Sequence, residues 1–147
     1  MLDIQMITSP LPLLFVVAAI VGLGVTGNLF SSSPLVIAVQ VAAVALNVWA
    51  RTSFQSGTFR VTAAPGADSL IKRGPYRFIR HPMYSAALVF IWAGVASHLS
   101  GLTLAIGIAV TAVCIVRVIA EERLLRAKYP EYLDYSRSTK AVIPFVF

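Results

Sequence analysis

Residues 82–116 read PMYSAALVFIWAGVASHLSGLTLAIGIAVTAVCIV, a stretch of 35 residues without one Asp, Glu, Lys or Arg. A second such stretch, residues 4–50, is 47 residues long. Because the hydrocarbon core of a bilayer needs about 20 helical residues, each stretch has room for two spans. Stop and start signals divide the stretches at residues 28–34 and 97–101. The sequence therefore predicts an all-α integral-membrane protein whose four spans form two antiparallel hairpins.

The predicted single membrane domain covers residues 1–147, with helices near 11–29, 34–50, 82–97 and 102–128, a connector at 51–81 and a tail at 129–147. We expect the fourth helix to extend beyond the membrane until Pro130 ends it. The tail is predicted to be a short amphipathic segment, with Tyr132 and Tyr135 on one helical side. Its apolar end, residues 142–147, is expected to fold back on the membrane surface.

Charge is scarce and confined. Only 12% of the residues are charged, against about a quarter in a soluble domain, which argues against soluble enzymes and nucleic-acid modules. Of the 12 Lys and Arg residues, half lie in residues 51–81 and half in 117–147. Such segments stay on the cytoplasmic side, so an even number of spans puts both blocks and both termini in the cytoplasm. The expected location is a prokaryotic plasma membrane, with membrane lipids and no nucleic acid as partners.

Residues 22–27, GLGVTG, match the glycine pattern of a dinucleotide site, but they lie within a predicted span and no carboxylate follows before Asp68. We interpret small residues at this spacing as helix-packing positions. Two such rows are present, Ala18, Gly22 and Thr26 in the first helix and Gly101, Ala105 and Ala109 in the fourth.

Polar residues within the spans are few. Gln40 lies in the middle of the second helix and is predicted to hydrogen-bond between helices, whereas Asn47 is near the cytoplasmic block, where lining a pocket is an alternative. No metal site is predicted, because the histidines, His81 and His98, fall on opposite membrane faces and Cys114 is the only cysteine.

The first basic block ends in residues 72–84, KRGPYRFIRHPMY. Pro82 suits the first turn of a helix, so His81 is expected at the N-cap, where free backbone N–H groups and the helix dipole favour an anion. Three arginines, Arg73, Arg77 and Arg80, add positive charge there. The alternative is a set of basic groups that meet lipid phosphates. That alternative leaves the Gly-Pro turn and the histidine unexplained.

The second block contains Glu121 and Glu122, in a chain with six acidic residues. One interpretation is helix pairing, since Arg117 precedes Glu121 by four residues and Arg126 follows Glu122 by four. The other is a carboxylate pair that binds a cationic or hydroxyl-bearing ligand opposite the anion site at His81. Either way, the two charged blocks are predicted to meet on one membrane face.

Three segments together resemble the isoprenylcysteine carboxyl methyltransferase family and its phospholipid methyltransferase relatives: RGPYRFIRHPMY at 73–84, the Glu121-Glu122 pair, and YPEYLDY at 129–135. The resemblance implies an integral-membrane methyltransferase that uses S-adenosylmethionine without a Rossmann fold. It implies cofactor contacts from Gly74, Pro75, Tyr76, His81, Tyr84, Glu121 and Glu122. It also implies that Tyr132 and Tyr135 cover the adenine or order the tail, and that Arg80 or Arg117 orients an acceptor carboxylate.

The implied acceptor is a lipid-like or apolar molecule, such as an isoprenylcysteine-type carboxylate, that reaches the site sideways from the bilayer. Similarly built nicotinamide-dependent membrane reductases are one alternative. A small four-helix transporter or partner subunit without enzymatic activity is another. A transporter is expected to place polar residues at the bilayer centre, where Gln40 is the one strong candidate in the sequence, and this favours the enzyme.

Overall fold

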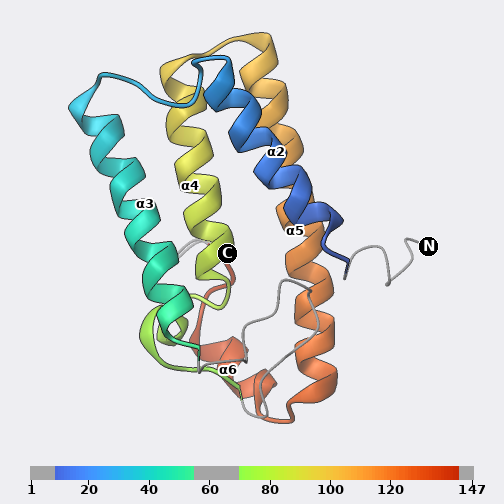
Figure 1. The fold of residues 1–147 in the computed structure, drawn as a ribbon. Coiled ribbons are helices and arrows are strands. Elements are labelled where there is room, and N and C mark those ends of the chain that lie inside the picture. The colour runs from blue at the N-terminus through green and yellow to red at the C-terminus, as the bar shows by residue number, and fades with distance from the viewer. Residues whose placement is uncertain (1–8, 55–69, 143–147) are drawn as a thin grey trace.

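The structure is a computed structural model that describes residues 9–54 and 70–142 (Figure 1). Within these residues the chain forms α-helices and one short 3-10 helix, with no strand of a sheet. The elements are α2 (Leu11–Val25), α3 (Pro34–Thr52), η1 (Gly74–Arg77), α4 (Pro82–Ser97), α5 (Gly101–Lys128) and α6 (Tyr132–Ser138). The prediction of an all-α chain is therefore confirmed.

The predicted first helix was too long at its C-terminal end. The structure ends α2 at Val25, because Gly27 takes a left-handed backbone conformation with φ of 70°. The N–H of Asn28 then donates to the Leu23 carbonyl over 2.8 Å, and the N–H of Gly27 to the Gly24 carbonyl over 3.1 Å. This is the Schellman arrangement that closes a helix end.

By length and composition, α3 and α5 can each cross a membrane. The other two apolar helices, α2 and α4, are shorter, at 15 and 16 residues. At the start of α5, Ser100 caps the helix by accepting from the Thr103 N–H over 3.2 Å, and the Thr103 hydroxyl accepts from the Ser100 N–H in return.

The helices pack in a different order from the predicted one. The main neighbour of α3 is α4, and α2 packs on α5, which also contacts α4 (Figure 1). The predicted pairing of the first two helices as a tight hairpin is thus corrected. Their link crosses α4, where Leu29 is buried and a Cβ added to Gly94 would lie 2.6 Å from the Leu29 carbonyl oxygen. The absence of a side chain at Gly94 makes room for this crossing.

The predicted packing rows of small residues were wrong. Ala18, Gly22 and Thr26 are exposed, and a Cβ added to Gly22 or Gly101 would meet nothing within 4 Å. Close packing occurs instead at Gly94 and at Gly107, which faces the Trp92 ring.

The two polar residues of α3 have partners. Gln40, only 4% exposed, donates from Nε2 to the Leu29 carbonyl over 2.8 Å and to the Phe90 carbonyl of α4 over 3.4 Å. The prediction of an interhelical hydrogen bond at Gln40 is confirmed. Asn47 accepts from Arg51 Nε over 3.0 Å, within the same helix.

The segment after α6 runs beside the residues that precede α4. A parallel bridge joins Ile79 and Lys140. The Arg80 N–H donates to the Lys140 carbonyl over 2.8 Å, and the His81 N–H to the Ala141 carbonyl over 2.9 Å. The tail is thereby fixed against the start of α4. The predicted return of the tail to the membrane surface concerns residues 142–147, of which 143–147 lie outside the described residues, as do residues 55–69 of the predicted connector at 51–81.

Candidate active site

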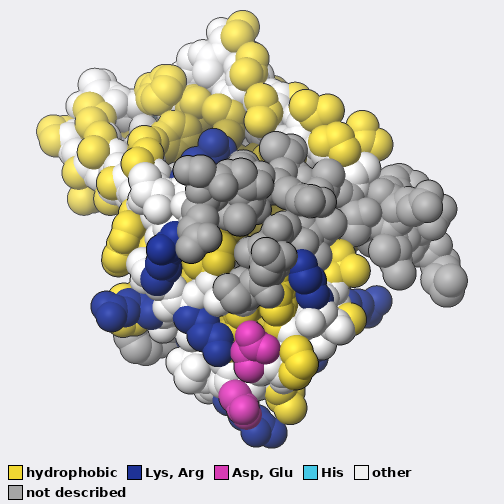
Figure 2. All heavy atoms as spheres, turned by 60° about the horizontal axis from the view of Figure 1, so that its bottom comes forward, with side chains coloured by type: hydrophobic (Ala, Val, Ile, Leu, Met, Phe, Trp, Pro, Cys, Tyr) yellow, Lys and Arg dark blue, Asp and Glu magenta, His cyan; other side chains and the backbone are white. Residues whose placement is uncertain are grey.

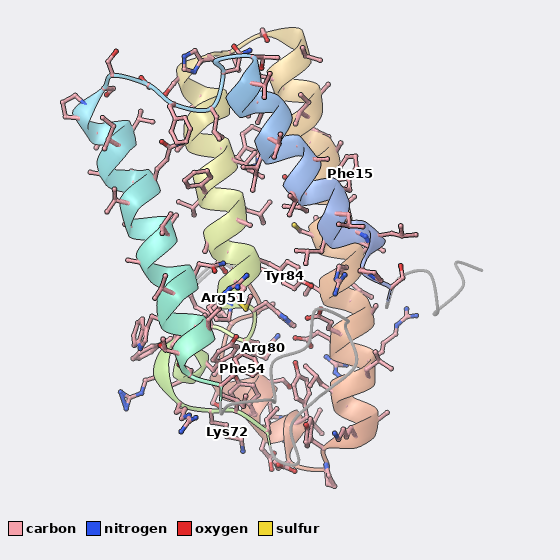
Figure 3. The ribbon with its side chains drawn as sticks, viewed as in Figure 1. Phe15, Arg51, Phe54, Lys72, Arg80 and Tyr84 are labelled. Atoms are coloured by element: carbon pink, nitrogen blue, oxygen red, sulfur yellow. The ribbon has the colours of Figure 1, made fainter. Side chains whose placement is uncertain are left out.

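The two charged blocks meet at one end of the helix bundle, where α4 begins and α5 and α6 approach each other (Figure 1). Arg80 and Tyr84 both lie at this end (Figure 3). In the view with this end forward, Lys and Arg side chains gather around a few carboxylates, and the surface beyond is mostly hydrophobic (Figure 2). The predicted meeting of the blocks is confirmed by the ion pair between Arg80 and Glu122, at 2.7 Å.

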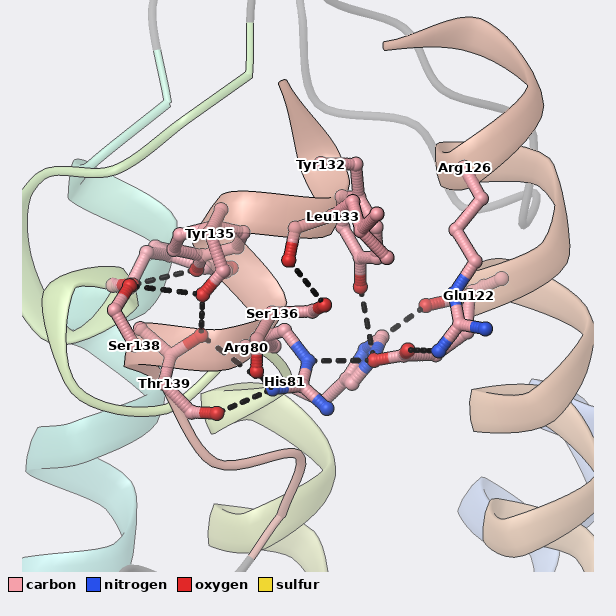
Figure 4. Close-up of polar contacts among 12 residues, drawn as sticks. Arg80, His81, Glu122, Arg126, Tyr132, Leu133, Tyr135, Ser136, Ser138 and Thr139 are labelled. Carbon is pink, nitrogen blue, oxygen red and sulfur yellow. Dashed lines mark hydrogen bonds and ion pairs between the residues drawn. The ribbon is translucent and has the colours of Figure 1, made fainter. Parts of the chain in front are cut away.

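Glu122 is the centre of the polar cluster (Figure 4). Its Oε1 accepts from Arg80 Nε at 2.7 Å and from the Tyr132 hydroxyl at 2.8 Å, and it lies 3.2 Å from His81 Nε2. Its Oε2 lies 3.3 Å from Arg126 Nη2. Since the side chain of Glu122 is only 12% exposed, these contacts replace most of its hydration.

Glu121 shares His81 with Glu122 and otherwise has its own partners on the side of α4. The Tyr84 hydroxyl donates to its Oε1 over 2.5 Å, and Arg117 Nη2 lies 3.5 Å from the same oxygen. Its Oε2 lies 3.5 Å from His81 Nδ1. The helix pairing that the spacing predicts is present for both glutamates, and each carboxylate also has partners from α4, α6 or the segment before α4.

The imidazole of His81 bridges the two carboxylates and is buried. Burial alone lowers the pKa of His81, but the hydrogen bonds and negative charges of Glu121 and Glu122 outweigh it, so the pKa of His81 is raised above its ordinary value. A protonated ring donates from both nitrogens, one to each carboxylate.

The predicted separation of an anion site at His81 from an opposing glutamate pair is corrected. His81 does stand at the N-cap of α4. However, its ring contacts Glu121 and Glu122 directly, with no gap for a ligand between them. Of the three arginines predicted beside His81, Arg80 is paired with Glu122.

Arg80 and Arg117 are both engaged by the protein. Arg80 Nη1 donates to the Ser136 carbonyl over 2.9 Å and also to the Thr139 carbonyl, which ties the tail to Glu122. Arg117, 4% exposed, donates from Nε to the Tyr84 hydroxyl over 2.8 Å and from Nη1 to the Ser9 carbonyl over 3.1 Å.

The Gly74, Pro75 and Tyr76 turn lies on the α3 side of the site. Gly74 has φ of 60°, and a Cβ there would collide with the hydroxyl of Ser53, the C-cap of α3, so both backbone and space require glycine. Pro75 and Tyr76 are buried, and the Tyr76 carbonyl accepts from the Tyr135 hydroxyl over 2.5 Å.

Tyr132 and Tyr135 pack on each other, with ring centroids 5.8 Å apart, and neither ring is more than 6% exposed. Burial raises the pKa of Tyr132, and the hydrogen bond to Glu122 raises it further. Tyr132 therefore stays protonated and donates to Glu122 across the ordinary pH range. These contacts join α6 to Glu122 of α5 and to the turn at Tyr76.

An open pocket of about 430 Å³ lies next to Glu122, between α5 and the tail. Of the predicted site residues, Arg80 and Glu122 line it. Its other lining residues, which the sequence interpretation missed, are Val118, Ile119, Arg123, Arg126, Ser136, Thr139, Lys140 and Ala141. Helical spacing around Glu122 was the available signal for Arg126, four residues later, and Val118, four residues earlier.

Within residues 9–54 and 70–142, no group of three or more His, Cys, Asp or Glu side chains is placed to hold a metal ion. The chemistry that the site offers consists of two carboxylates, a histidine between them, and guanidinium groups beside a partly apolar pocket.

The chain matches the family described as phospholipid methyltransferase over residues 29–132. It is 34% identical over 80 residues to the nickel-cobalt-cadmium resistance protein NccN of Alcaligenes xylosoxydans xylosoxydans, covering 53% of this chain and 37% of that protein. It is 30% identical over 78 residues to the cobalt-zinc-cadmium resistance protein CzcN of Cupriavidus metallidurans, covering 52% and 36%. The alignments thus span little more than a third of these curated relatives. No solved structure matches the chain.

Proposed function

The chain belongs to the phospholipid methyltransferase family, and from this membership we propose that it transfers a methyl group from S-adenosylmethionine to a lipid-like or apolar acceptor at the membrane. The observation that carries the proposal is Glu122, a carboxylate held by Arg80 and Tyr132 at the wall of a pocket of about 430 Å³. Pockets for small molecules and cofactors commonly measure about 300–1,000 Å³.

The residues that line the pocket fit the chemical groups of S-adenosylmethionine. The Glu122 carboxylate suits an ammonium or ribose hydroxyls, the guanidinium groups suit a carboxylate, and Val118 and Ile119 suit the adenine face. When bound, S-adenosylmethionine supplies a methyl group on a positively charged sulfur, which takes back the electron pair of the broken carbon–sulfur bond. Methyl transfer depends more on alignment than on a strong base, so the task of the protein is to hold both partners in place.

The protein's own contacts support such a positioning role. Arg80 joins Glu122 to the tail carbonyls of Ser136 and Thr139. One guanidinium therefore fixes the positions of both the carboxylate and the opposite wall of the pocket. The His81 ring, which does not line the pocket, contacts both Glu121 and Glu122 and so fixes the position of the Glu122 carboxylate. The carboxylate therefore needs little reorganisation when a ligand enters.

An apolar acceptor has a path to this pocket along α5. Ile119 lines the pocket and is 46% exposed, and Ile115, one turn earlier and 47% exposed, continues the same face toward the middle of the helix. This continuity supports a lipid-like acceptor that stays in the bilayer. For an isoprenylcysteine-type carboxylate, Arg80 is the proposed partner because it lines the pocket, whereas Arg117 does not.

The proposal includes four spans, with both termini in the cytoplasm of a prokaryotic cell. Exposed apolar side chains on the shorter helix α2, such as Leu14, Val17 and Val21, support its contact with lipid. A helix of 15 residues falls just below the range of about 17–25 residues for a full span, so flanking residues must lie at the headgroup level.

Calorimetric titration of the purified protein in detergent tests the function. We expect micromolar-scale binding of S-adenosylmethionine, weakened at least about tenfold, or about 1.4 kcal/mol, by Glu122→Gln. Glu131→Gln removes an exposed glutamate outside the pocket and serves as the matched control. Folded protein that binds a nicotinamide cofactor instead would replace the proposal with the reductase alternative, and folded protein that binds neither would refute it.

A further inference from the structure

Besides Arg80, three cations line the pocket beside Glu122, namely Arg123, Arg126 and Lys140. Arg126 pairs with Glu122 at 3.3 Å. The side chains of Arg123 and Lys140 form no ion pair or hydrogen bond within the part of the chain that the structure describes. The pocket therefore has an excess of positive charge next to one carboxylate.

The two oxygens of Glu122 differ in their surroundings. Oε1 is fully used by Arg80, His81 and Tyr132. Oε2 meets only Arg126 among the described residues, and the side chain of Arg126 is 57% exposed. An exposed pair at this helical spacing contributes little to stability, so a ligand can open it at low cost. Once the pair is open, Glu122 Oε2 and the guanidinium of Arg126 are both available to a ligand at the pocket wall.

This pair of opposite charges matches an α-amino-acid group, in which an ammonium and a carboxylate are attached to one carbon. We infer that the pocket binds such a zwitterion between Glu122 Oε2, which takes the ammonium, and Arg126, which takes the carboxylate with Arg123 and Lys140 nearby. The inference rests on the proposed function, since it assigns the amino-acid end of S-adenosylmethionine to this wall.

Arg80 is the other guanidinium in the pocket. It is the proposed partner of the acceptor carboxylate, and its contacts with the protein leave it less free than the three cations to take the carboxylate of the methyl donor as well. Its Nε is paired with Glu122, and its Nη1 donates to tail carbonyls. The three cations are therefore the specificity-determining residues for the ligand carboxylate. The remainder of the ligand is left to the apolar wall of Val118 and Ile119.

The test compares ligands with and without the carboxylate. The probes are S-adenosylhomocysteine, decarboxylated S-adenosylmethionine, and methylthioadenosine, which lacks the whole amino-acid part, titrated into full-length protein in detergent. For Arg126→Gln and for the triple variant R123Q/R126Q/K140Q, we expect the affinity for S-adenosylhomocysteine to fall at least about tenfold while that for methylthioadenosine stays within about twofold. The preference of the wild type for S-adenosylmethionine over its decarboxylated form should disappear in the triple variant.

Two controls make the result specific. Arg137→Gln removes an exposed arginine of α6 that pairs with Asp134 and does not line the pocket, so no ligand should bind differently. Arg126→Lys keeps the charge and should recover much of the lost affinity. Equal losses for all ligands, or an unchanged affinity for S-adenosylhomocysteine in the triple variant, would overturn the inference and leave the methyltransferase proposal intact. A wild-type protein that binds none of the adenosyl ligands would overturn both.

Discussion

Arg117, on α5, donates from Nε to the hydroxyl of Tyr84, on α4, over 2.8 Å. The same hydroxyl donates to Glu121 over 2.5 Å. One neutral group thus joins a buried cation to a carboxylate and links the two helices of the second hairpin at the edge of the site. Its two bonds explain why a tyrosine rather than a phenylalanine stands at this position.

Tyr84→Phe should destabilise the protein by roughly 1–3 kcal/mol, because Arg117 loses an acceptor and Glu121 a donor in a largely buried place. The measurement is the thermal unfolding midpoint in detergent. Ser138→Ala, which removes an exposed hydroxyl of α6, is the control and should change the midpoint little. If neither substitution changes the unfolding midpoint, the Tyr84 hydroxyl does not contribute to the stability of the protein.

Stability should depend on pH through His81. Its pKa is raised in the folded protein, so the stabilisation from its protonated ring is complete below the unfolded value of 6.5 and is lost as the pH rises through the raised value. The unfolding midpoint should therefore fall as the pH rises above about 6.5, and this fall should be shallower in His81→Gln. The same slope in His81→Gln as in the wild type would contradict the bridging role of the imidazole.

Gly94→Ala should lower stability by roughly 1–3 kcal/mol, since the new Cβ would lie 2.6 Å from the Leu29 carbonyl oxygen and the backbone of the link must move. Gly22→Ala is the matched control, in a helix interior with open space around it, and should be neutral or stabilising by up to about 1 kcal/mol. Both are read from thermal unfolding. If Gly94→Ala is tolerated as well as Gly22→Ala, the close crossing at Leu29 is wrong.

Cysteine labelling in intact cells tests the four spans. In a Cys114→Ala background, a membrane-impermeant maleimide should label Ser32→Cys, in the link between α2 and α3, from outside. It should label Ser138→Cys and Ser9→Cys only after permeabilisation. Labelling of Ser32→Cys and Ser138→Cys from the same side would contradict the three spans proposed between them.

Local signals predicted most of the helices. Pro34 and Pro82 mark helix starts, and α4 has the predicted bounds, because such signals act over a few residues. The meeting of Arg80 with Glu122 followed from topology, since both blocks had to lie on one face. The sequence did not predict which helices pack against each other. Which helix α2 packs against depends on where the Leu29 link crosses α4, and no periodicity in the sequence encodes that crossing.

The pocket was predicted only in part for the same reason. Its wall opposite Glu122 comes from the tail, and the tail is positioned by backbone bonds such as that from the His81 N–H to the Ala141 carbonyl. Because every residue type carries nearly the same backbone groups, their hydrogen-bond partners cannot be predicted from the sequence. Arg123 and Lys140 in turn looked like ordinary members of the charged blocks.

The pairing of residues 78–81 with the segment after α6 also bears on the order of assembly. The hairpin of α4 and α5 closes over a short turn, whereas the Ile79–Lys140 bridge joins residues far apart in the chain and carries a larger loop-closure entropy. We therefore expect the helices to assemble before the tail docks, and the pocket to be complete only after docking.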